Sequence, residues 1–291
     1  MRTGRTWKTL TVLMVLIGLV AVAGPARASD HGRKDWYLAL GDSLSVGVQP
    51  ISGPTDNHPT MNGYADQIYN ELKLTTPNLE LKKLGCGVTE TSESMLKGPS
   101  DCRNQYRLRV QLADAVAFLL THRGSVKLVT IDIGANDLEI CGNIETGIDP
   151  VCVQDAFSDG GANLPKILKA LRLAAGPNVP IVGMNYYNPF LAAWLAGATE
   201  LAEQSNQLVA AYNGLLGSIY QVFHMPVADV ATAFDTANFE LVPAPSSAFP
   251  PMVPQNVLNV CGLTYMCALG NIHATTDGYG VITQAFLEVL P

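Results

Sequence analysis

The sequence is poor in charged residues, which make up 15% of its 291 residues, whereas globular domains usually carry roughly 25%. Hydrophobic residues account for 48%, which excludes a disordered chain, because disorder needs low hydrophobicity and high charge. Positive charge is also scarce, with 18 Lys and Arg against 25 Asp and Glu and a net charge of −7. A nucleic-acid partner is therefore not expected, because phosphate backbones attract basic surfaces.

Long apolar runs are absent except near the N-terminus, where residues 10–23 are interrupted only by Thr11 and Gly18. At 14 residues this run is short for a membrane span, which needs roughly 20. Three basic residues precede it (Arg2, Arg5 and Lys8), and a small-x-small pattern ending at Ala28 follows it. This arrangement predicts a signal peptide over residues 1–28, cleaved after Ala28, and a secreted chain of residues 29–291 without a membrane span. An uncleaved membrane anchor is the alternative.

Metal-ligand spacing is missing as well, because the sequence has no Cys-x-x-Cys pair and no histidine pair at ligand spacing. The six cysteines therefore favour disulfides over zinc, as expected for an exported chain with an even number of cysteines. Six cysteines allow 15 pairings, and the sequence alone does not choose among them. Their grouping into close couples suggests Cys86–Cys102, Cys141–Cys152 and Cys261–Cys267.

Apolar runs bounded by turn residues alternate with segments of helical periodicity, which is typical of a parallel sheet with crossover helices. The predicted strands are residues 36–40, 79–84, 127–133, 179–185 and 225–230. A helix is expected to open at Gly160 and Gly161, residues 191–219 are helical in character, and a last helix ends the chain. No linker or internal repeat divides the sequence. We expect a signal peptide followed by one α/β domain over residues 29–291.

Four short motifs place polar or glycine residues at strand exits or before the last helix. Ser43 follows the first strand in Gly-Asp-Ser-Leu, where the ligand crevice of an open parallel sheet lies. Gly87 follows the second strand, and Asn136 follows the third in Gly-Ala-Asn-Asp; both can donate to a developing oxyanion. His273 precedes the last helix and can act as a general base. Each motif alone is also an ordinary turn or helix cap.

Together, in this order, the four motifs resemble those of the SGNH hydrolases, also called the GDSL esterase/lipase family. The resemblance covers nearly the whole chain after the signal peptide, and the cysteine couples resemble the secreted, disulfide-bonded bacterial branch. It implies a three-layer α/β/α sandwich with a flavodoxin-like parallel sheet of about five strands, and hydrolysis of carboxylic esters. It also implies that Ser43 is the nucleophile and His273 the base, with the Ser43 N–H, the Gly87 N–H and the Asn136 side chain forming the oxyanion hole. No metal or organic cofactor is expected.

The sequence departs from the family pattern at the third member of the catalytic triad. The family usually carries Asp three residues before the histidine, and that position is Gly270 here. Asn271 is not an acid either. A backbone carbonyl of Gly270 or Asn271 is expected to hold the imidazole with Nδ1 protonated, which is the tautomer that the base needs. A non-catalytic exported binding protein is the alternative from another functional class.

A long Pro-rich stretch, residues 241–267, does not fit the alternation of strands and helices. Loops of this length without secondary structure are usually functional or disordered. Because residues 241–258 are unusually apolar, we expect them either to form the wall of a site for an apolar ester or to pack on the core; the sequence does not tell whether they act as a lid. The first interpretation favours lipid or other acyl esters, and an acetyl-carbohydrate esterase is the nearest rival. A monomer is expected.

Overall fold

The computed structural model describes residues 33–143 and 146–290, and the described residues from Lys34 onward belong to one compact unit. The expected signal peptide, residues 1–28, lies outside the described residues. Among the described residues, no helix has both the length and the apolar character that a membrane crossing requires.

The central element of this unit is a five-stranded parallel sheet, as predicted. Its strands are β1 (Asp35–Gly41), β4 (Leu79–Lys83), β5 (Val126–Asp132), β8 (Ile181–Met184) and β9 (Val227–Ala228). They lie in the order β4-β1-β5-β8-β9, which is the flavodoxin-like order 2-1-3-4-5. The strand order reverses between β1 and β5, and ligands of such sheets bind at that switch point, beyond the carboxyl ends of the strands.

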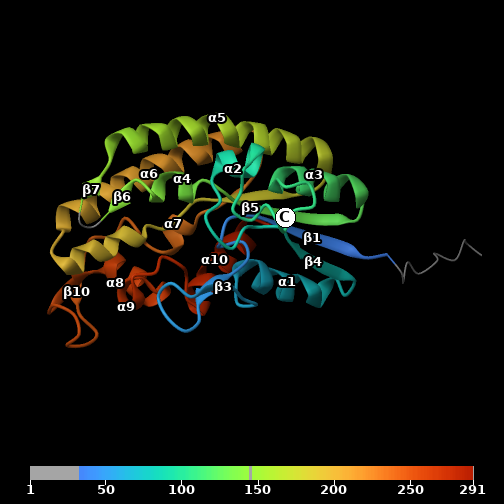
Figure 1. The fold of residues 1–291 in the computed structure, drawn as a ribbon. Coiled ribbons are helices and arrows are strands. Elements are labelled where there is room, and N and C mark those ends of the chain that lie inside the picture. The colour runs from blue at the N-terminus through green and yellow to red at the C-terminus, as the bar shows by residue number, and fades with distance from the viewer. Residues whose placement is uncertain (1–32, 144–145, 291) are drawn as a thin grey trace, which may run out of the picture. The chain divides into compact units, whose positions relative to one another are not determined.

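Helices cover both faces of the sheet (Figure 1) and are listed here with their bounds: α1 (Tyr64–Thr75), α2 (Ser92–Lys97), α3 (Gln111–Thr121), α4 (Ala135–Glu139), α5 (Pro150–Ala175), the 3₁₀ helix η1 (Pro189–Ala196), α6 (Thr199–Val222), α7 (Val230–Ala233), α8 (Gln255–Leu263), α9 (Met266–Leu269) and α10 (Thr276–Val289). Helices α3, α5 and α6 pack on one face, and α1 and α10 pack on the other. The predicted three-layer α/β/α sandwich is therefore confirmed. Strands β1 and β5 are almost entirely buried between these layers.

One helix prediction was wrong in its boundary, and one segment expected to be helical is helical in two pieces. The helix expected to open at Gly160 begins ten residues earlier, at Pro150, where the Asp149 side chain caps the N–H groups of Val151 and Cys152. Gly160 therefore lies inside α5. The position requires glycine because the ring of Tyr212 occupies the space in which a side chain would lie. Residues 191–219 do not form one helix, because η1 ends at Gly197 in a left-handed conformation before α6 begins.

Three short hairpins complete the described chain: β2 (Val48–Pro50) with β3 (Asn57–Pro59), β6 (Gly142–Asn143) with β7 (Gly147–Ile148), and β10 (Leu241–Pro243) with β11 (Met252–Pro254). The third hairpin and α8 replace the loop expected over residues 241–267. Their buried Val253, Val257 and Val260 pack with Leu191 of η1 in a second, smaller apolar cluster. Of the two interpretations of residues 241–258, packing on the protein is therefore the correct one.

The six cysteines form three disulfides in the sequential couples, Cys86–Cys102, Cys141–Cys152 and Cys261–Cys267. They span 16, 11 and 6 residues, respectively. Each one cross-links a connection between regular elements. Such a cross-link stabilises the fold because it lowers the conformational entropy of the unfolded chain.

Candidate active site

Ser43 lies just beyond the carboxyl end of β1, in a turn that Gly41 makes possible. Gly41 has φ +130°, and a Cβ atom there would lie 1.9 Å from the carbonyl oxygen of Asp132 on the neighbouring strand. The buried Gln111 side chain accepts from the Gly41 N–H at 2.7 Å and donates to the Gly41 carbonyl at 2.9 Å. The backbone before the serine is thus held from both sides.

His273 reaches Ser43 from the segment between α9 and α10. Its Nε2 lies 2.9 Å from the Ser43 hydroxyl oxygen, and both residues are 8% exposed. Burial lowers the pKa of His273 to about 4, because an imidazolium is poorly solvated there. The imidazole is therefore neutral at neutral pH and can accept a proton from the serine.

The residue that orients His273 is Asn271, through its side chain and not through a backbone carbonyl. The Asn271 Oδ1 lies 2.8 Å from the His273 Nδ1 and also accepts from the His273 backbone N–H at 3.1 Å. The Asn271 Nδ2 donates to the carbonyl of Pro54 at 2.7 Å and to the Oδ1 of Asn57 at 2.8 Å. Since both partners of Nδ2 are acceptors, the amide oxygen must face the imidazole, and Nδ1 must carry the proton.

The expectation of a backbone carbonyl at Gly270 or Asn271 was therefore wrong. Gly270 ends α9 in a left-handed conformation, and its N–H donates to Met266. The sequence did contain a signal, since an amide oxygen two residues before the histidine can accept from Nδ1. Asn271 was missed because only a carboxylate or a backbone carbonyl was considered as the partner of Nδ1.

Asn136 is the second residue of α4, directly after β5, and lines the same pocket as Ser43 and His273. Its Nδ2 donates to the carbonyl of Glu90 at 3.0 Å. Because an amide carries two N–H groups, one of them remains for a substrate. The structure thus brings three of the predicted site residues, Ser43, His273 and Asn136, together at the switch point of the sheet.

Gly87 lies in the loop after β4 and does not line that pocket. The neighbouring Cys86 donates its N–H to the carbonyl of Gly41 at 3.1 Å, which joins this loop to the strand that carries Ser43. A Cβ atom at Gly87 would lie 3.0 Å from the ring of Pro59, so the position has little space for a side chain.

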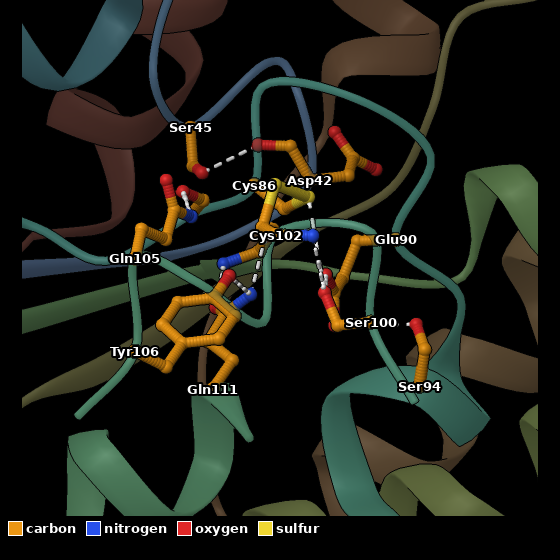
Figure 2. Close-up of a disulfide and its surroundings, with 12 residues drawn as sticks. Asp42, Ser45, Cys86, Glu90, Ser94, Ser100, Cys102, Gln105, Tyr106 and Gln111 are labelled. Atoms are coloured by element: carbon orange, nitrogen blue, oxygen red, sulfur yellow. Dashed lines mark hydrogen bonds between the residues drawn. A yellow bond between two sulfur atoms is a disulfide. The ribbon is translucent and has the colours of Figure 1, made fainter. Parts of the chain in front are cut away.

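Glu90, which sequence analysis missed, holds Asn136 through its backbone carbonyl and also carries a buried carboxyl group. Glu90 is fully buried beside the Cys86–Cys102 disulfide, and its carboxyl accepts from the Ser100 and Ser94 hydroxyls at 2.6 and 3.2 Å (Figure 2). Burial raises the pKa of Glu90 to about 7. The Glu90 carboxyl and both sulfur atoms could approach a common metal position, but the disulfide engages both sulfurs.

Two further acids near the nucleophile bind backbone groups. Asp42 accepts from the Leu44 N–H at 2.9 Å, and Asp137 accepts from both the N–H and the hydroxyl of Ser92 at 2.8 and 2.6 Å. Burial raises the pKa of each to about 6. Asp132, at the end of β5, accepts from the Tyr64 hydroxyl at 3.1 Å, and burial raises its pKa well above the ordinary value.

The pocket next to Ser43 has a volume of about 90 Å³ and is mainly apolar. Its walls come from α4, the β6–β7 hairpin, η1 and α6, including Leu138, Ile148, Phe190, Leu208 and Val209. No residue from 241–258 lines it. The expectation that this stretch forms a wall of the site was therefore wrong, because its apolar side chains are used in packing against η1.

A sequence model of the GDSL-like lipase/acylhydrolase family matches residues 39–281, from within β1 to within α10. The chain belongs to this family. The match supports an ester hydrolase, and it includes the positions of Ser43, Asn136 and His273. No curated protein matches the chain.

Solved structures show the same fold at low sequence identity. An extracellular lipase from Streptomyces rimosus is 19% identical, with a TM-score of 0.53 over 88% of this chain and 100% of the lipase. A variant of an acetyl xylan esterase from Geobacillus stearothermophilus is 17% identical, with a TM-score of 0.50 over 87% of this chain and 93% of the esterase. The two neighbours act on different ester classes, so the shared fold does not choose a substrate.

Proposed function

We propose that the protein is a secreted serine ester hydrolase that forms an acyl-enzyme on Ser43. His273 takes the proton of the Ser43 hydroxyl as the oxygen attacks the ester carbonyl, and then gives it to the leaving alcohol. Water repeats the sequence on the acyl-enzyme and regenerates the serine. The observation that carries this proposal is the chain of contacts from Ser43 Oγ to His273 Nε2 and from His273 Nδ1 to Asn271 Oδ1.

The oxyanion formed in each step is stabilised by the Ser43 N–H and by the Asn136 amide. The Gly87 N–H is kept as a third donor on the family resemblance alone, because Gly87 does not line the pocket. The position of Asn136 in the pocket supports its assignment as a donor. The hydrogen bond that its amide donates to the Glu90 carbonyl, which fixes the side chain, supports it as well. Such a donor contributes about 10²–10³-fold to turnover in a known serine hydrolase. Asn271 acts through His273 and is a positioning residue.

Substitution of the nucleophile tests the mechanism. Ser43→Ala should reduce hydrolysis of nitrophenyl butyrate to the background rate, and an organophosphonate should label the wild-type protein but not this variant. Ser218→Ala, at an exposed serine on α6, is the matched control and should retain both activity and labelling. Undiminished hydrolysis by Ser43→Ala would contradict the mechanism, and failure of the organophosphonate to label Ser43 would favour the non-catalytic alternative.

The apolar pocket favours esters with a short or medium apolar group over acetylated carbohydrates. A cavity of about 90 Å³ is small, so a long chain does not fit without rearrangement. In a series of nitrophenyl esters, kcat/KM should rise from acetyl to butyryl and fall for long chains. Activity restricted to the acetyl ester would instead support the carbohydrate esterase.

A further inference from the structure

An acidic side chain without a partner lies in the pocket that holds Ser43 and His273. Glu139 is the last residue of α4, three residues after Asn136, and lines this pocket. Among the described residues, its carboxyl forms no hydrogen bond or ion pair, and burial alone raises its pKa. Glu139 is half-buried, and a carboxylate that has lost part of its water is stabilised by an opposite charge, so a positively charged group from outside the chain would complement it.

The rest of the pocket adds negative charge and no fixed positive charge. Asp42 also lines it, and its Oδ2 is buried without a hydrogen-bond partner among the described residues. Burial raises the pKa of Asp42, and the charge of Glu139 adds to this effect, so the two carboxyls interact across the site. The described lining residues include no Lys or Arg, and His273 is neutral at neutral pH.

Aromatic rings form a large part of the same lining. Tyr186, Tyr187, Phe190 and Tyr212 all border the pocket. The face of an aromatic ring carries partial negative charge and attracts organic cations, particularly where water is excluded. Aromatic rings together with a carboxylate are the chemistry that recognises alkylammonium groups, whereas a neutral alkyl chain gains nothing from Glu139.

We propose that this pocket binds a positively charged alkylammonium group of the ester substrate, and that Glu139 determines this specificity. The inference rests on the proposed function, because it assigns a substrate class to the same site. The cation can belong to the alcohol part of the ester, as in a choline ester, or to the acyl part, as in an ester of a trimethylammonio acid.

A binding experiment tests the cation preference without any turnover. Choline and 3,3-dimethylbutan-1-ol have the same shape, but the second carries carbon in place of the charged nitrogen. By calorimetry on Ser43→Ala protein, choline should bind about tenfold more tightly than the neutral alcohol. Adding Glu139→Gln should remove this preference, and adding Glu139→Asp should retain part of it. Adding Glu71→Gln, an exposed acid on α1, loses the same charge and should leave the preference intact.

Two matched pairs of esters then locate the cation in the substrate. Acetylcholine is compared with 3,3-dimethylbutyl acetate, and ethyl 4-(trimethylammonio)butyrate with ethyl 5,5-dimethylhexanoate. With Ser43 present, kcat/KM should favour the charged ester in one pair, which identifies the part of the ester that enters the pocket. Glu139→Gln should lower that charged-to-neutral ratio by about tenfold.

Failure of this inference is distinguishable from failure of the proposed function. Equal or tighter binding of the neutral alcohol, or a preference that survives Glu139→Gln in a protein with an unchanged thermal unfolding curve, would refute the cation site. Preference for the neutral ester in both pairs would refute it as well. Hydrolysis of no ester at all, with choline binding still dependent on Glu139, would refute the hydrolase and leave the cation site standing.

Discussion

At the scale of single residues, the most informative position is Asn271. An amide oxygen fixes the Nδ1–H tautomer of His273, as a carboxylate does in most serine hydrolases, but it brings no negative charge to stabilise the imidazolium. Burial lowers the pKa of the imidazole to about 4. A base with a low pKa stays unprotonated in acidic solution, so under the proposed mechanism we expect activity to extend toward low pH.

The pH dependence of activity follows from this arrangement. Because His273 must be neutral to act, kcat/KM for nitrophenyl butyrate should fall on the acid side near pH 4 and not near the ordinary histidine value of about 6.5. Asn271→Asp places a charge beside Nδ1, which favours the imidazolium and raises its pKa. The acid limb should therefore move to higher pH.

Asn271→Ala should reduce kcat by about 10²-fold or more, because the base loses its orientation.

A control variant separates charge from anchoring. Asn57→Ala removes one acceptor of the Asn271 amide but adds no charge, so it should lower kcat modestly and leave the acid limb in place. An acid limb near pH 6.5 in the wild-type protein, unmoved in Asn271→Asp, would show that burial and the neutral partner do not set the pKa of His273.

At the scale of elements, regular structure was predictable where a single segment carries its own signal. Most of the sheet strands were predictable as apolar runs bounded by turn residues, whereas β4 has the sequence LELKK and alternates apolar and charged residues over its first four positions. The β2–β3 hairpin was not predicted. Its contact with the site could not be predicted from local sequence, because Pro54 and Asn57 bind Asn271 across more than 210 positions of sequence. The apolar composition of residues 241–258 predicted that their side chains would be covered. It does not distinguish a substrate from η1, which is the partner in the structure.

The wall of the pocket depends on one disulfide. Cys141 lines the pocket, and its bond to Cys152 ties the end of α4 and the β6–β7 hairpin to the first turn of α5. Replacing both cysteines with serine should destabilise the protein by about 3 kcal/mol, or roughly 9 °C in Tm. It should also lower the ratio of kcat/KM for butyryl to acetyl nitrophenyl esters, because the wall that contacts the longer group is loosened.

The Cys261–Cys267 disulfide provides the comparison, because neither of its cysteines lines the pocket. Serine at both positions should lower Tm while leaving the butyryl-to-acetyl ratio unchanged. If both double variants changed the ratio equally, the effect would belong to general loosening of the protein and not to the wall of the pocket.

At the scale of the whole molecule, buried acids collect at the carboxyl edge of the sheet, and no buried Lys or Arg lies beside them in the part of the chain that the structure describes. Asp42, Glu90 and Asp137 each have a pKa raised by burial, to about 6, 7 and 6. Their hydrogen-bond partners are hydroxyl and backbone N–H groups. A chain that already carries a net charge of −7 thus concentrates its least solvated carboxyls around the nucleophile.

The stability of the protein should therefore increase as the pH falls from 8 to 5. Between about pH 4, the ordinary carboxyl pKa, and pH 6–7, the folded state binds more protons than the unfolded state, so the free energy of unfolding decreases with rising pH. His273 has the opposite effect, since its pKa is lowered by folding and stability is lost as the pH falls from 6.5 toward 4. The carboxyls with raised pKa values (Asp42, Glu90, Asp132, Asp137 and Glu139) outnumber the one imidazole, which leaves a higher Tm at pH 5 than at pH 8. Glu90→Gln, which cannot titrate, should flatten this slope near pH 7, whereas Glu71→Gln at an exposed position should not. A Tm that rises from pH 5 to pH 8 would contradict this prediction. It would mean that the pKa values of these carboxyls are not raised in the folded protein and that their negative charges are stabilised there.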